Sequence, residues 1–222
     1  MSAASVESFA DTALDPPVRG FVHRPASPSG DGLVFTHGAG GNARGPLLVT
    51  LAEAFAGAGF TVLRCDLPFR QARSFGPPRP NEAERDRQGL KNAVAALRQT
   101  ASGRMFLGGQ SYGGRQATML AAEDPELADG LVLTSYPLHP PGRPDQLRTQ
   151  HFPNLRTPVL FVEGTRDPFA APAEIEAALK LIPAKTSLLR MENVGHDLGF
   201  RGKSGSSDLA ATVLAEFHRF FR

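Results

Sequence analysis

A single cysteine, Cys65, excludes an internal disulfide and is compatible with a reducing compartment. No apolar run approaches the roughly 18 residues that a membrane span needs. The N-terminal residues have neither the basic flank nor the apolar core of a signal peptide. These absences lead us to expect a soluble, cytoplasmic protein that does not associate with membranes.

The chain also lacks a strong charge of either sign. Its net charge is +2 with histidine neutral, and its arginines are scattered. A nucleic-acid partner would require clustered basic residues, so we expect none. The 222 residues, of which 41% are hydrophobic, suffice for one domain with a single sizeable core. We expect a monomer or a homodimer that uses no cofactor and no metal.

The stretch around Ser111 carries the clearest functional motif. Gly109, Ser111 and Gly113 read Gly-x-Ser-x-Gly, between an apolar run at 105–107 and a helix-forming run at 116–122. Strand, sharp turn and helix are the context in which such a serine becomes an exposed nucleophile. The motif is weak by itself in a chain with 23 glycines. The alternative is an ordinary serine on a glycine-rich turn.

Possible partners for this serine follow two later strands. Asp167 follows one predicted buried strand and His196 follows the next, with one predicted helix between them. The carboxyl ends of parallel strands meet at one edge of a sheet, so we expect both side chains beside Ser111. His196 would take the serine proton, and Asp167 would hold the other ring N–H. Each could instead be an ordinary loop residue, and Glu163 and Asp197 are reserve acids.

A glycine-rich loop at 37–42 follows the apolar run at 32–36. In a hydrolase this loop would supply one N–H group of an oxyanion hole. We predict Ala39 as that donor, paired with the N–H of Tyr112. We also predict that His37, Gly38 and Gly40 in this loop bind the substrate, together with His139 from the later segment 137–156.

The same loop permits a second interpretation. Residues 38–43 match Gly-x-Gly-x-x-Ala, and Asp66 ends the following strand, where a ribose-binding acid lies in dinucleotide-binding folds. We favour the oxyanion loop for two reasons. The next helix starts near Pro46, well past the glycines, and His37 stands where a small or apolar residue is usual. A purely structural glycine turn stays open until Ser111 is shown to react.

Other features have structural interpretations that we weigh against functional ones. We expect Cys65 in the core and His151 in an exposed loop. Arg115 lies in the first turn of the helix after Ser111, a poor place for a cation. It either forms a surface salt bridge, which we favour, or contacts an anionic substrate. Residues 1–18 are expected to be a loose arm or a short edge strand, and residues 137–156 a small lid-like insertion.

Taken together, these motifs resemble a known family. From about Arg19 onward the chain resembles the α/β-hydrolase superfamily, in its small, capless, dienelactone-hydrolase-like branch. More narrowly, residues 36–41, 111–115, 136–142 and 164–168 resemble a family that includes testis-expressed and histone-acetyltransferase-complex subunits alongside bacterial hydrolases. The resemblance implies an α/β fold with about eight mostly parallel strands, helices on both faces and no cap domain.

We therefore predict a single α/β-hydrolase domain over residues 1–222 that is a serine hydrolase, carboxylesterase- or thioesterase-like. It would cleave a small-molecule carboxylic ester or thioester through an acyl-enzyme on Ser111. Dienelactone hydrolases proper use a cysteine nucleophile, so their substrate is not carried over. The alternative is a catalytically silent interaction module, because some eukaryotic relatives are complex subunits. A dinucleotide-binding protein is less favoured.

Overall fold

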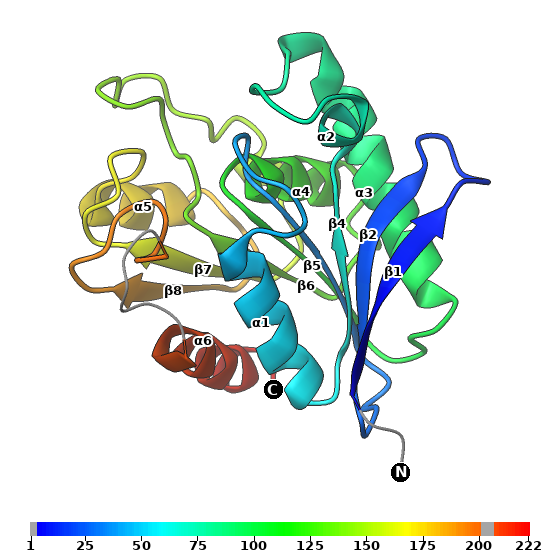
Figure 1. Cartoon of the computed structure of the whole chain (residues 1–222). Helices are drawn as coiled ribbons and strands as arrows, with labels where there is room; N and C mark the ends of the chain where they lie inside the picture. The colour runs from blue at the N-terminus through cyan, green and yellow to red at the C-terminus, as the bar shows by residue number, and fades with distance from the viewer. Residues whose placement is uncertain (1–3, 201–206) are drawn as a thin grey trace.

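The computed structural model describes residues 4–200 and 207–222. Its sheet has eight strands in the order β1-β2-β4-β3-β5-β6-β7-β8 (Figure 1). The first two pairings, β1 with β2 and β2 with β4, are antiparallel, and the five that follow are parallel. The predicted mostly parallel sheet of about eight strands is confirmed. The strands are β1 (Ser5–Asp11), β2 (Val18–Arg24), β3 (Gly32–Thr36), β4 (Thr61–Cys65), β5 (Met105–Gln110), β6 (Gly130–Thr134), β7 (Val159–Gly164) and β8 (Thr186–Met191).

Helices cover both faces of the sheet, as predicted (Figure 1). One face packs against α1 (Pro46–Gly57) and α6 (Ser207–Phe220). The other packs against α3 (Ala83–Arg98), α4 (Tyr112–Glu123) and α5 (Pro172–Leu179), with the short α2 (Pro68–Ala72) after β4. Of the helices in the described ranges, none is both long and apolar enough to cross a membrane.

The central strands read as continuous apolar runs because both of their faces are buried. In β7, Val159 and Phe161 point into the core beneath α3, α4 and α5, whereas Leu160 and Val162 point into the core beneath α1 and α6. Cys65 at the end of β4 is buried, as predicted, and burial raises the pKa of its thiol to about 12. The two cores fix the carboxyl ends of β3, β5, β6 and β7 along one edge.

The structure also shows how two segments outside the layered core, residues 5–11 and 137–156, are held. Residues 5–11 are not a loose arm but the edge strand β1, paired with β2 along its whole length. The ends of segment 137–156 are anchored by three fully buried side chains, Leu138, Phe152 and Leu155. Between them, residues 141–147 are exposed. In the part of the chain that the structure describes, this segment adds no cap domain above the sheet edge.

Candidate active site

Ser111 sits at the sharp turn between β5 and α4. Its backbone has φ 51° and ψ −116°, a conformation that a residue with a side chain adopts only when its surroundings enforce it. Those surroundings are tight. A Cβ on Gly109 would lie 2.6 Å from the backbone of Gly113, and a Cβ on Gly113 would lie 2.6 Å from the carbonyl oxygen of His37. Glycine is therefore required on both sides of the serine, which explains the spacing of the motif.

Three side chains form a hydrogen-bonded chain at this turn. His196 Nε2 lies 2.8 Å from Ser111 Oγ, and His196 Nδ1 lies 2.7 Å from Asp167 Oδ2. A carboxylate only accepts, so Nδ1–H donates to Asp167, which leaves Nε2 to accept the serine hydroxyl proton. The structure thus brings together the three residues that the sequence predicted.

Backbone contacts hold the two acid–base loops side by side. The loop after β7 is tied to the segment after β8, because Thr165 N–H donates to Met191 O (3.0 Å) and Arg166 N–H donates to Val194 O (2.9 Å). The second oxygen of Asp167 accepts the N–H of Phe169 at 2.8 Å. The Asp167 side chain is fully buried and that of His196 is 25% exposed, so the carboxylate is shielded from water and the imidazole is accessible.

Phe169 supports the histidine ring. The two ring centroids lie 4.2 Å apart with an interplanar angle of 34°. This contact limits rotation of the imidazole while Asp167 holds Nδ1. Nothing in the sequence marked Phe169, since its role arises from a loop conformation and not from a motif.

The reserve acids occupy other positions. Glu163 is buried on β7 and accepts the Tyr136 N–H at 2.7 Å. Burial, with a smaller contribution from the charge of Asp167, raises the pKa of its carboxyl well above the usual range. Asp197 accepts the N–H of Gly199 at 3.1 Å. Asp167 is the acid that meets His196 Nδ1.

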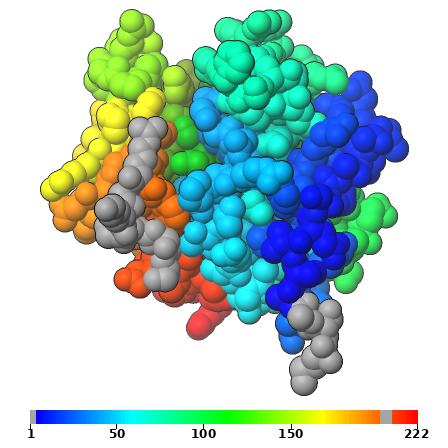
Figure 2. Space-filling view, viewed as in Figure 1, coloured from blue at the N-terminus to red at the C-terminus, as the bar shows by residue number. Residues whose placement is uncertain are grey.

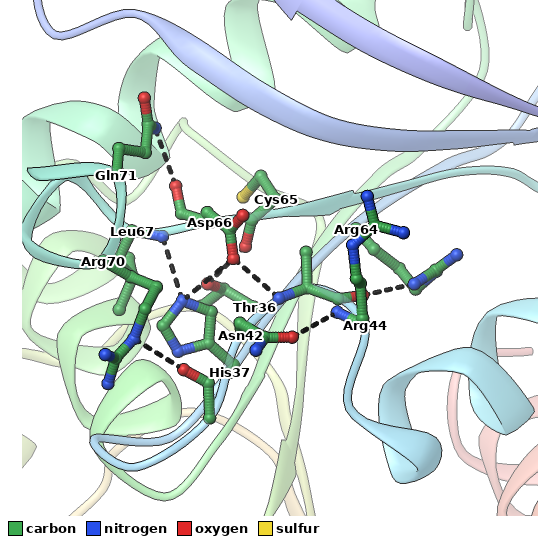
Figure 3. A network of polar contacts seen from close by, with 12 residues as sticks. Thr36, His37, Asn42, Arg44, Arg64, Cys65, Asp66, Leu67, Arg70 and Gln71 are labelled. Atoms are coloured by element: carbon green, nitrogen blue, oxygen red, sulfur yellow. Dashed lines mark hydrogen bonds and ion pairs between the residues drawn. The ribbon is translucent and has the colours of Figure 1, made fainter. Parts of the chain in front are cut away.

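The predicted oxyanion loop is held by its own His37 and by side chains of β4 and of the segment that follows β4 (Figure 3). Asp66 Oδ1 accepts the N–H of Ala43 at 2.7 Å. His37 Nε2 accepts the N–H of Leu67 at 3.1 Å, and Arg64 donates to Ala43 O. These contacts hold both ends of the loop against β4 and the chain that follows it.

Arg70 on α2 makes the most extensive contact with this loop. Its guanidinium donates to Gly41 O at 2.8 Å, to Ala39 O at 2.9 Å and to Gly76 O at 3.0 Å. The residue is 8% exposed. Arg70 therefore ties the loop that contains the predicted donor Ala39 to the proline-rich segment at residues 76–80. Sequence reasoning missed it, because backbone carbonyl acceptors leave no residue pattern.

Two of the predicted substrate-binding residues lie outside the cleft. The ring of His37 is 1% exposed, and both of its nitrogens contact backbone groups of the loop region. Burial lowers its pKa. His139 is 5% exposed and contacts Pro140 O and Glu174 through its two nitrogens. These two predictions are wrong because the loop backbone turns both rings into the protein. There the rings are buried and bind groups of the neighbouring loops.

His151 differs from expectation in another way. It is not an exposed loop residue but is partly buried against α4, with Nε2 2.8 Å from Thr118 Oγ1. Burial, followed by the charges of Arg115 and Arg87, lowers its pKa to about 4. Its ring also packs edge-on against Phe152.

The dinucleotide interpretation does not fit this geometry. A ribose-binding acid must be available to ligand, but Asp66 Oδ1 is taken up by the loop amide of Ala43. The helix that follows the loop begins at Pro46, so its N-terminus does not lie at the first glycines.

Among residues 4–200 and 207–222, there is no group of three or more His, Cys, Asp or Glu side chains that could hold a metal ion.

Ser111 and His196 open into a cleft of about 1390 Å³. It is lined on one side by Gly38, Ala39 and Gly40 and on the other by parts of segment 137–156 and the loop after β7. Figure 2 shows the hollow between two projecting lobes, the yellow-green insertion and the teal proline-rich segment. Both predicted oxyanion donors, Ala39 and Tyr112, belong to this lining. Their catalytic roles stay predictions.

Comparison with solved structures places this fold among known hydrolases. A dienelactone hydrolase from Anabaena variabilis is 22% identical, with 99% of each chain covered and a TM-score of 0.77. A serine hydrolase without a lid from Xanthomonas campestris is 17% identical, covers 99% of this chain and 95% of its own, and has a TM-score of 0.69. Est1E from Butyrivibrio proteoclasticus is 14% identical, with 98% of each chain covered and a TM-score of 0.72.

The sheet order, the sharp turn at Ser111 and these neighbours define a hydrolase fold without a lid. Residues 30–220 match the family described as "Alpha/beta hydrolase domain". The chain belongs to this family. The family resemblance and the fold class expected from the sequence are thereby confirmed.

Proposed function

We propose that this protein is a serine hydrolase that cleaves a carboxylic ester or thioester through an acyl-enzyme on Ser111. The observation that supports this most strongly is the continuous chain of two short hydrogen bonds, 2.8 Å from Ser111 to His196 and 2.7 Å from His196 to Asp167. A serine hydroxyl is a poor nucleophile at neutral pH, and it needs such a base within hydrogen-bonding distance.

In the proposed acylation, Ser111 Oγ attacks the substrate carbonyl carbon as its proton passes to His196 Nε2. The N–H groups of Ala39 and Tyr112 stabilise the oxyanion, and each such donor contributes about 3 kcal/mol in known enzymes. Asp167 stabilises the imidazolium ion. His196 then returns the proton to the departing alcohol or thiol, which leaves an acyl ester on Ser111.

Deacylation uses the same groups in reverse. His196 removes a proton from water, which attacks the acyl carbonyl, and the proton returns to Ser111 Oγ as the bond breaks. The open, lidless cleft supports a small-molecule substrate that enters directly. The neighbours named as dienelactone hydrolase and serine hydrolase are consistent with this assignment.

Turnover of simple substrates tests the proposal. We would measure hydrolysis of 4-nitrophenyl acetate and S-phenyl thioacetate by wild type, Ser111→Ala and His196→Ala, with Ser102→Ala as a control on an exposed loop serine. The expected result is turnover by wild type and Ser102→Ala and a loss of 10³-fold or more, as an order of magnitude, in the other two. Equal turnover by Ser111→Ala, or none of either substrate by wild type, contradicts the proposal. The latter result favours a silent interaction module.

A further inference from the structure

Two guanidinium groups face the cleft beside the proposed nucleophile. Arg115 lies in the first turn of α4, and Arg148 lies in segment 137–156. Both line the cleft with Ser111 and His196. Burial, and then the charge of Arg115 in the same cleft, lower the pKa of the Arg148 guanidinium. Two like charges are thus held in one partly buried space.

Neither charge is neutralised by a carboxylate within the described ranges. The ion pairs there involve other arginines, a lysine and three histidines, so the expected salt bridge of Arg115 is not formed. The only side-chain hydrogen bond from Arg148 to a described residue goes to Pro137 O at a long 3.3 Å. A cation in the first turn of a helix is further disfavoured by the partial positive charge of that end. An anion between the two guanidinium groups removes both penalties.

Two buried donors at the same place lack acceptors. Arg115 Nε and Gln116 Nε2 have no hydrogen-bond partner among the described residues. Gln116 is fully buried and also lines the cleft. A buried donor without an acceptor is unfavourable, so these two atoms are a second and independent indication of a ligand that accepts hydrogen bonds.

The position of Arg148 is fixed by its backbone. Its N–H donates to Leu138 O at 2.8 Å, and its carbonyl accepts the hydroxyl of buried Tyr136 at 3.1 Å. The guanidinium is therefore presented from an anchored part of the insertion. Apolar side chains complete the same cleft, which suits the hydrocarbon part of a substrate: Leu47, Met119, Phe169 and Phe200.

We propose that Arg115, Arg148 and Gln116 bind a carboxylate group of the substrate, so that the enzyme acts on esters or thioesters that carry a carboxylate away from the scissile bond. Arginine matches carboxylate geometry with paired N–H donors, and a carboxylate accepts several hydrogen bonds at once. This inference rests on the proposed hydrolase function. The carboxylate lies on the acyl side or on the alcohol side, and the test separates the two.

The test compares matched charged and neutral esters. On the acyl side, 4-nitrophenyl hydrogen glutarate is compared with 4-nitrophenyl pentanoate. On the alcohol side, 4-acetoxybenzoic acid is compared with its methyl ester. Wild type, Arg115→Met, Arg148→Met and Arg148→Lys are assayed, with Arg143→Met as the control because Arg143 is exposed on the same insertion and does not line the cleft.

In one of the two arms we expect kcat/KM of wild type to favour the charged ester. Each Met variant should lose about 10- to 100-fold on that ester and less than threefold on the neutral one. Arg148→Lys should retain part of the preference, and Arg143→Met all of it. Preference for the charged ester in neither arm, or a preference that both Met variants retain, overturns the inference.

A fluorophosphonate reaction keeps the two proposals apart. If wild type reacts with the probe but shows no preference for a charged ester, only the carboxylate site is wrong. If wild type does not react, the hydrolase function itself fails. Glutarate should also slow labelling of wild type more than labelling of Arg148→Met. Equal slowing of the two proteins counts against the site.

Discussion

Replacement of Arg70 by methionine should lower kcat although this residue does not contact the nucleophile. Its guanidinium holds Ala39 O, Gly41 O and Gly76 O at 2.8 to 3.0 Å, so it fixes the loop from which Ala39 is proposed to donate to the oxyanion. Complete loss of one oxyanion donor costs about 10²- to 10³-fold in kcat. Arg70→Met loosens that donor without removing it, so we expect a loss of about 10- to 100-fold.

The same substitution should lower the free energy of unfolding by about 2 to 4 kcal/mol, because the buried Arg70 side chain and its hydrogen bonds to three carbonyl groups are lost. Steady-state kinetics with 4-nitrophenyl acetate should show the effect in kcat and leave KM nearly unchanged, since the oxyanion forms only during reaction. Denaturation curves identify conditions in which the variant is folded. Arg70→Lys keeps the charge but reaches fewer carbonyls, so its kcat should lie between those of Arg70→Met and wild type.

Arg73→Met is the matched control. Arg73 is a neighbouring arginine. Its side chain donates hydrogen bonds to Glu82 and Pro77 O and to no residue of the loop at 37–42. Its variant should keep kcat within about threefold of wild type. A folded Arg70→Met with a kcat within twofold of wild type would refute the positioning role, as would an equal loss in the two variants.

Three further substitutions test charges in and below the site. Asp167→Asn should lower kcat by roughly 10³- to 10⁴-fold with little change in stability, because an amide does not hold the Nδ1–H tautomer of His196; single-turnover kinetics and thermal melts check this, and a loss below tenfold would contradict it. Burial raises the pKa of Glu163, so the folded state keeps a proton that the unfolded chain releases, and the free energy of unfolding falls as pH rises above the ordinary glutamate value. Glu163→Gln should remove that fall between pH 5 and 8 in urea titrations, and an unchanged slope would show that Glu163 is not its source. Burial, then the charge of Arg64, lowers the pKa of His23 to about 4, so stability is complete above pH 6.5 and is lost as pH falls from 6.5 toward 4. Wild type should lose up to roughly 3 kcal/mol of its free energy of unfolding through this histidine, and His23→Gln should not show that loss. A variant as acid-sensitive as wild type would disprove the assignment.

Much of the candidate site was predictable because its residues occupy positions that the fold specifies. Ser111 and Asp167 follow the buried strands β5 and β7, and His196 follows the edge strand β8. The buried strands are recognisable as short apolar runs. Parallel pairing then brings their ends to one edge of the sheet. The glycines around Ser111 were equally predictable, since the backbone approach in the elbow leaves no space for a Cβ.

Side-chain direction in the loops was not predictable. His37 and His139 stand in the expected segments, but the loop backbone turns both rings into the protein, and periodicity says nothing about such turns. Arg70 binds carbonyl groups, which every residue has, so no pattern marks its partners. For residues 1–18 the sequence left a loose arm and a short edge strand open, because the pairing of β1 with β2 is a tertiary contact that decides between them.

The reactivity of Ser111 is the central claim, and labelling with a fluorophosphonate tests it most directly because the probe requires no knowledge of the substrate. Intact-mass analysis should show one adduct on wild type, none on Ser111→Ala and much slower labelling of His196→Ala. Peptide mapping should place the adduct on Ser111. Folded wild-type protein that forms no adduct, or forms it equally in Ser111→Ala, would contradict the proposal that this site is a working serine hydrolase.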